Sequence, residues 1–194
     1  MGLTITKPND FVSEQPSPTY LDPFCFNGQL RFPQRPVVLE TAFKGRRWAA
    51  LTAQDRTFVD KAAIGGKAEV QLGELAVKNA KSAEVKKFGQ RMIDDHTKAN
   101  NELTSLAAAK GMTPPAELDS KNKSTLERLS RLSGDQFDKA YMSDMVTDHE
   151  ADVAEFQKQA NGNGDPAIKA FASKTLPTLQ EHLQLAKSIA SKQK

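Results

Sequence analysis

From about residue 53 onward, apolar residues recur at spacings of three and four in a chain rich in Ala, Lys, Glu, Leu and Gln. That spacing is the period of an α-helix with one face against a core, and these residue types favour helices. The pattern marks four long segments, at about 53–80, 82–110, 135–161 and from 165 onward, and a short one around 126–132. We find no segment with the alternating pattern of a strand, so the sequence predicts an all-α fold.

Turn signals separate these segments and set the lengths of the connections. Gly111 and the prolines that follow it end the second segment, an Asn-Gly-Asn-Gly stretch ends the third, and Asp165 followed by Pro166 is a typical helix start. Helices of about 26 residues are each about 39 Å long, and two short turns and one long link connect them. The arrangement predicts a four-helix bundle over residues 53–192, with a short connector helix between the second and third long helices.

Residues 1–50 differ from the rest in composition. They hold six of the ten prolines and seven of the thirteen aromatic residues, including Trp48, and no helical or alternating period survives at that density of proline. We expect residues 1–50 to be a poorly ordered extension or the product of a misassigned start. Despite Arg46 and Arg47, no apolar run has the length that a secretory signal needs, and none approaches the ~20 residues of a membrane span.

The charge and the cysteine content exclude several classes of function. Lys and Arg number 27 and Asp and Glu number 24, and the net charge of +3 does not indicate a nucleic-acid-binding protein. A single cysteine, Cys25, excludes an internal disulfide and cysteine-based metal clusters. Any metal must therefore be held by Glu, Asp, His or Met. The sequence identifies neither a protein partner nor an oligomeric state.

All three histidines of the chain lie on the apolar faces of three different long segments. His96, His149 and His182 each have apolar residues three or four positions before and after them, so each points toward the core. Glu69 holds the corresponding position in the first long segment. All four lie near the middle of their helices, and the midpoints of packed helices meet at one level whichever way each helix runs. One carboxylate and three imidazoles should therefore converge in the centre of the bundle, where metal and cofactor sites are built.

This polar layer has more than one interpretation. Imidazole and carboxylate are ligands for Fe, Mn, Zn or Cu, so Glu69, His96, His149 and His182 are a candidate site for one transition metal. Alternatively, the layer binds no metal and only fixes the packing of the helices, with Glu69 paired to a histidinium. An enzyme that uses His and Glu in acid–base chemistry would need an opening to the core. Beyond a Gly-Gly pair at 65–66, nothing in the sequence provides one.

Two short motifs supply further candidate ligands. Met92 and Met145 each lie one helical turn before a core-face histidine, where a thioether would bind a soft ion such as Cu(I) or fill the core. Asp95 and Asp148 each directly precede such a histidine and point about 100° away from it. They are interpreted as extra ligands, as hydrogen-bond partners of a histidine on a neighbouring helix, or as solvated residues.

Three stretches of the chain carry specific combinations of these residues: FVDKAAIGGKAEVQLGELA at 58–76, VKKFGQRMIDDHTKANNEL at 85–103 and LPTLQEHLQLAKSIA at 176–190. They resemble a bacterial family of exported proteins described as domain of unknown function 4142, over about residues 53–191. The resemblance implies a ferritin-like bundle and a periplasmic or cell-envelope location. The matching polar positions here are Glu69, Asp95, His96, His149 and His182.

The resemblance implies no activity. Ferritin-like di-iron sites use Glu-x-x-His pairs, which this chain lacks because Ile93, Val146 and Leu179 stand three residues before the histidines. The sequence therefore favours a mononuclear, histidine-rich site with a redox or stress role over a di-iron oxidase. The alternative function is a metal-free helical module that acts by interaction.

Overall fold

The computed structural model describes residues 51–193, and within that range every regular element is a helix. The helices are α1 (Ala53–Asn79), α2 (Ala83–Ala109), α3 (Ser120–Ser130), α4 (Gly134–Asn161) and α5 (Pro166–Ala190). The all-α prediction is confirmed, and the four long helices begin and end close to their predicted bounds. None of the described helices is long and apolar enough to span a membrane. The expectations for residues 1–50 lie outside the described residues.

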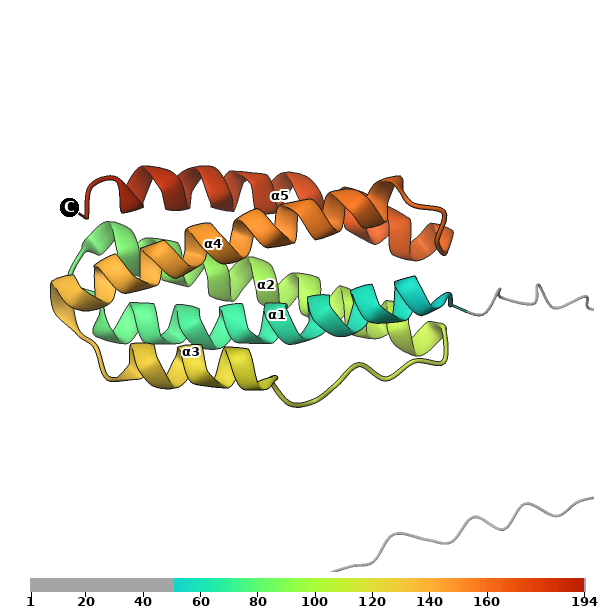
Figure 1. The fold of residues 1–194 in the computed structure, drawn as a ribbon, viewed down its shortest axis with the longest axis horizontal. Coiled ribbons are helices and arrows are strands. Elements are labelled where there is room, and N and C mark those ends of the chain that lie inside the picture. The colour runs from blue at the N-terminus through green and yellow to red at the C-terminus, as the bar shows by residue number, and fades with distance from the viewer. Residues whose placement is uncertain (1–50, 194) are drawn as a thin grey trace, which may run out of the picture. The chain divides into compact units, whose positions relative to one another are not determined.

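The long helices form two antiparallel hairpins, α1 with α2 and α4 with α5 (Figure 1). Helix α1 also packs against α4, and α2 against α5, so each long helix has two long neighbours. The link that contains α3 returns along the outside of α1, so that α4 runs in the same direction as α2 (Figure 1). A long crossover between the second and third long helices is the connection of ferritin-like bundles, and the predicted fold class is confirmed.

Buried acidic side chains fix the two ends of the bundle. Thr52 caps α1 in a capping box with Asp55, whose other carboxylate oxygen accepts a hydrogen bond from Gln159 Nε2 of α4 at 2.6 Å. At the opposite end, Asp138 of α4 accepts a hydrogen bond from the backbone N–H of Ser82 at 2.7 Å. Helix α4 is therefore tied to the start of α1 and to the start of α2, which sets the level at which the helix midpoints meet.

The apolar core consists of two clusters, one in each half of the bundle. The first includes Leu72, Phe88, Met92, Phe137, Tyr141, Met145 and Ala186. The second includes Phe58, Ala63, Leu103, Phe156, Ile168, Phe171 and Leu179. Along each long helix, one buried polar residue lies between the residues of the two clusters: Glu69, His96, His149 and His182. These four residues, the polar layer, divide the core at mid-height.

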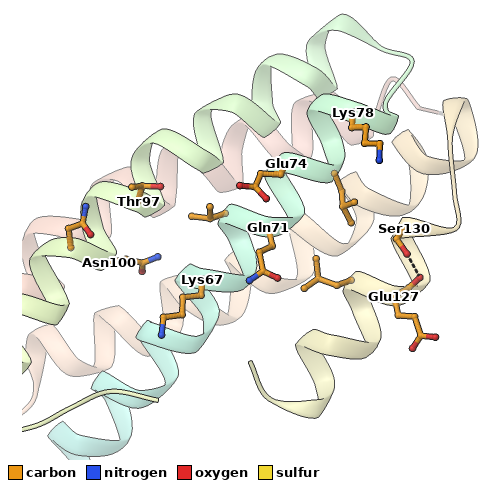
Figure 2. Close-up of a pocket in the computed structure, with 12 residues that line it drawn as sticks. Lys67, Gln71, Glu74, Lys78, Thr97, Asn100, Glu127 and Ser130 are labelled. Atoms are coloured by element: carbon orange, nitrogen blue, oxygen red, sulfur yellow. Dashed lines mark hydrogen bonds between the residues drawn. The ribbon is translucent and has the colours of Figure 1, made fainter. Parts of the chain in front are cut away.

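The outer surface of the first hairpin is hollowed where α3 lies beside it. A groove of about 910 Å³ runs between α1, α2 and α3. Figure 2 shows Gln71 and Glu74 of α1, Thr97 of α2 and Glu127 of α3 around this groove. The groove is lined largely by polar side chains and by none of the three histidines.

Candidate metal centre

Three helices bring their histidines together in the middle of the bundle. His96, His149 and His182 are at most 7% exposed, and their ring centroids lie 5.4–5.8 Å apart. Among the described residues, they form a group in which one possible ligand atom from each lies within 4.8 Å of the others. The convergence arises from the packing of α2, α4 and α5, because each histidine lies on the apolar face of its own helix.

Hydrogen bonds determine which ring nitrogen carries the proton in His149 and in His182. His149 Nδ1 lies 2.9 Å from the Met145 carbonyl oxygen, which only accepts, so Nδ1 carries the proton and Nε2 keeps its lone pair. His182 Nε2 lies 2.8 Å from Asp95 Oδ2 and donates to this carboxylate, which leaves the lone pair on Nδ1. A metal-binding histidine usually donates its other ring N–H to a carbonyl or a carboxylate in this way.

The nitrogens that carry the free lone pairs have no partners in the described part of the chain. They are His149 Nε2 and His182 Nδ1, and His96 Nε2 is likewise buried without a hydrogen bond. A buried polar atom that lacks a partner costs about 1–3 kcal/mol, so three of them in one place are expensive to keep. One cation bound between them would satisfy all three.

The histidines are neutral in this environment. Burial, with the neighbouring histidines, lowers the pKa of His96 to about 3, and burial lowers the pKa of His149 to about 4. Burial also lowers the pKa of His182, although Asp95 opposes this shift. Neutral imidazole is the form that binds metal, so the site is in its ligating state at neutral pH.

Glu69 lies beside His149 but outside the group of three histidines. Its Oε1 is 4.0 Å from His149 Nδ1, which is too far for a hydrogen bond, and its Oε2 has no partner. Burial raises the pKa of Glu69 well above its ordinary value, and the negative charges of Asp152 and Asp148 raise it further. In the absence of a cation the carboxyl group is therefore driven toward its neutral form, not toward an ion pair with a histidinium.

The additional candidate ligands lie in three different settings. Met92 and Met145 are fully buried in the first apolar cluster, and Met145 also supplies the carbonyl that orients His149. Asp95 reaches across from α2 to α5 and accepts from His182, and it also accepts from Arg91 Nε at 3.2 Å. Asp148 faces α3, where Lys121 Nζ lies 3.1 Å from its Oδ1. Of the two aspartates, Asp95 alone is joined to the polar layer by a hydrogen bond.

Two aromatic residues beside the layer were not identified as site residues from the sequence. Phe88 packs against His149, His182 and Tyr141, with ring centroids 6.2–6.5 Å apart. The Tyr141 hydroxyl is buried without a hydrogen-bond partner. Tyr141 lies two helical turns before His149 on one face, and that spacing was the available signal, but the same spacing is typical of ordinary core packing.

The donor set fits a mononuclear site better than a dinuclear one. Two nitrogens bound to a tetrahedral ion at 2.0–2.1 Å are about 3.4 Å apart. The possible ligand atoms here lie within 4.8 Å of one another, so they need to approach by up to roughly 1.4 Å. Three neutral imidazoles suit Zn, Cu or Fe, and a three-ligand set leaves a position open for water or another small ligand. The bridging carboxylates of a di-iron site are not present in this group.

The sequence matches a known protein family, and the fold matches solved structures. The family described as Domain of unknown function (DUF4142) matches residues 41–189. The chain belongs to the DUF4142 family. The match begins upstream of α1 and covers the bundle almost to the end of α5, and with it the predicted resemblance is confirmed.

The solved structures that are similar to this DUF4142 chain share its fold. A DUF305 fragment from Deinococcus radiodurans matches with a TM-score of 0.65 and 13% identity, over 73% of this chain and 98% of that one. A DUF305 protein from Streptomyces coelicolor matches with a TM-score of 0.63 and 11% identity, over 72% and 92%. No curated protein matches the chain. At these identities the similarity establishes a common helical fold and nothing about activity.

Proposed function

We propose that this DUF4142 protein binds a single transition-metal ion through His96, His149 and His182 in the middle of its bundle. The observation that carries the proposal is the set of three buried, neutral imidazoles, each with a buried ring nitrogen that has no hydrogen-bond partner among the described residues. Zn, Cu, Fe or Mn are the candidate ions, and with a redox-active ion the protein would act in redox or stress chemistry. Glu69 would lie beside the bound ion as a neighbouring carboxylate.

The second candidate is a metal-free helical module in which the polar layer only fixes the packing of the helices. Two observations favour it. The possible ligand atoms lie up to 4.8 Å from one another, which is farther apart than the ligands of one bound ion. The histidines and Glu69 are also driven toward their neutral forms without an ion. In that case the histidines would specify how the two hairpins dock. The protein would then act through its surface.

Elemental analysis of the purified, untagged protein separates these two candidates. We expect about one equivalent of a transition metal per chain, and loss of that metal in His96→Ala, His149→Ala and His182→Ala. Met142→Leu is the matched control, because it changes a fully buried core residue and leaves the three imidazoles in place. Metal at 100 times its Kd should also stabilise the folded protein by about 2.7 kcal/mol.

Other results would contradict the metal proposal or favour the metal-free module. A protein without stoichiometric metal, whose melting temperature does not respond to added Zn²⁺, Cu²⁺, Fe²⁺ or Mn²⁺, would contradict the metal proposal. Histidine variants that lose stability to the same extent with and without metal would favour the metal-free module.

For location we propose the periplasm or the cell envelope. This proposal rests on the resemblance to exported proteins that the sequence carries. Fractionation of cells that express the natural gene, followed by detection of the protein with an antibody against the bundle, tests it. Recovery in the cytoplasmic fraction alone would contradict it.

A further inference from the structure

A cavity connects the surface of the bundle to two of the three histidines. It has a volume of about 120 Å³ and lies between α2 and α5, and His96 and His182 are both among its lining residues. A space of this size holds several water molecules. The cavity lies on the side of the histidine group that α2 and α5 form, and His96 and His182 reach it from these two helices.

The rim of this cavity is polar and carries charge. Glu102 of α2 and Lys174 of α5 are exposed at the rim and form an ion pair across it, with Lys174 Nζ 2.9 Å and 2.7 Å from the two carboxylate oxygens. Asp95, which hydrogen-bonds His182, also lines the cavity. Thr178 lies one helical turn before His182 and is half-buried in the wall.

Hollow space continues inward from the cavity along His96. A second hollow of about 20 Å³, enough for a single water molecule, shares His96, Ala99 and Thr175 with the first and extends to Gly66. A Cβ atom on Gly66 would lie 2.1 Å from Asn100 Oδ1, so the glycine makes room for the Asn100 side chain, which also lines this hollow. The path from solvent therefore runs past Thr178 and reaches the ring of His96.

The larger groove on the outside of α1 and α2 provides no comparable path. Its 910 Å³ volume is lined by Thr97, Gln71 and Glu127 among others, and by none of the three histidines (Figure 2). Thr97 follows His96 directly in sequence but turns about 100° away from it around α2. The large volume of this groove therefore does not give solvent access to the histidines.

We infer that the cavity between α2 and α5 is the entrance through which a hydrated divalent cation reaches the three histidines. The inference rests on the proposed function and adds the route to it. The carboxylates of Asp95 and Glu102 attract the cation. The ammonium groups of Lys98 and Lys174, which also line the cavity, oppose that attraction. Thr178 and Ala99 are small enough to let the ion pass to His182 and His96.

A charge reversal on the exposed rim tests the route without disturbing the core. Co²⁺ is the probe, because its ligand-field absorption reports binding directly in stopped-flow measurements. Glu102→Lys should slow the binding of Co²⁺ by about threefold or more at low ionic strength, and the difference from wild type should disappear at high salt. Glu127→Lys, in the groove outside α1, is the matched control and should leave the rate within experimental error of wild type.

A steric block provides the second test. Thr178→Phe should slow both binding and release of Co²⁺ by about tenfold or more, and the Kd should stay unchanged because the histidines are intact. Thr178→Val keeps the size of the side chain and should bind at the wild-type rate. Thr97→Phe places the same ring in the outer groove and should also bind at the wild-type rate.

The possible outcomes distinguish a failure of the proposed entrance from a failure of the proposed metal site. Wild-type protein that binds no Co²⁺ would overturn the proposed function together with this inference. Wild-type binding with unchanged rates in Glu102→Lys and in a folded Thr178→Phe would overturn the inference alone, and so would slow binding by Thr97→Phe or Glu127→Lys. If Thr178→Phe does not fold, Glu102→Lys against Glu127→Lys decides.

Discussion

At the scale of single residues, the three histidines differ in what surrounds them. His149 is oriented by a carbonyl of its own helix, whereas His182 is oriented by Asp95 from the neighbouring helix. A carboxylate behind an imidazole makes the ring a better ligand and holds its orientation. The two Met-x-x-Asp-His motifs are thus alike in sequence and unlike in structure, because Asp148 faces Lys121 instead.

This difference gives a direct test at Asp95. We expect Asp95→Ala to raise the Kd for Zn²⁺ by about 10–100-fold, since His182 loses its outer partner. Asp148→Ala is the matched control and should bind with nearly wild-type affinity, because its carboxylate pairs with an exposed lysine. Competition titration against a chelator measures both. Equal losses in the two variants would contradict the assignment.

Glu69 gives a prediction about pH in the metal-free protein. Because its pKa is raised in the folded state, the stability that it contributes is present below its ordinary value of 4.5 and is lost as the pH rises through the folded value. Glu69→Gln should therefore equal wild type at pH 4 and exceed it in stability at pH 8.

Urea denaturation with a chelator present measures the difference between the two proteins at each pH. Contributions from the histidines are common to both proteins and cancel in that difference. Glu74→Gln, an exposed position on the same helix, should change stability by no more than about 0.5 kcal/mol at either pH. A Glu69→Gln variant that is less stable at pH 8 would show that the carboxylate is favourably paired.

At the scale of the elements, the α1–α2 hairpin depends on a close backbone approach. A Cβ atom on Gly89 would lie 2.7 Å from Ala76 Cβ, and one on Gly73 would lie 2.6 Å from the Gly89 carbonyl oxygen. Both contacts are closer than side chains tolerate, so α1 and α2 approach here only because both residues lack a side chain.

Alanine substitutions at two glycines should therefore act in opposite directions. Gly89→Ala should destabilise the protein by about 1–3 kcal/mol, because the hairpin must open to admit the methyl group. Gly65→Ala should stabilise it by about 0.5–1 kcal/mol, because its Cβ meets nothing within 4 Å and alanine favours the helix. Urea denaturation at pH 7 measures both. Stabilisation by Gly89→Ala would contradict the close packing.

At the scale of the whole molecule, the polar layer interrupts a core that is otherwise apolar in both halves. An apolar layer of similar volume would bury no unpartnered nitrogen, and buried polar groups are often replaced by apolar ones with a gain in stability. The layer is therefore expected to weaken the metal-free fold.

The triple variant His96→Leu, His149→Leu and His182→Leu tests this. In the presence of a chelator it should unfold at a urea concentration equal to or higher than wild type, and metal should no longer change its stability. Size-exclusion chromatography and the dispersion of the amide NMR spectrum serve as controls for a unique fold. A stable variant that becomes loosely packed or changes oligomeric state would instead favour the role of the layer in fixing helix packing.

Much of the candidate site was accessible from the sequence because it depends on helical period alone. The apolar stripes place Glu69, His96, His149 and His182 on core faces, and their mid-helix positions place them at one level. Both properties follow from 3.6 residues per turn and from helices of similar length, which are local features of the chain. The same reasoning predicted the helix bounds from caps and turn residues.

What only the tertiary structure decided is how each helix is rotated and which neighbours it has. The crossover along α1 makes α5 the neighbour of α2, so that Asp95 meets His182 and a cavity opens between these helices. A small rotation decides whether Glu69 joins the histidines or lies beside them, and whether the Tyr141 hydroxyl finds a partner. Periodicity locates a face of a helix, but contacts between helices arise from packing of side chains that are distant in sequence, and no local pattern records them.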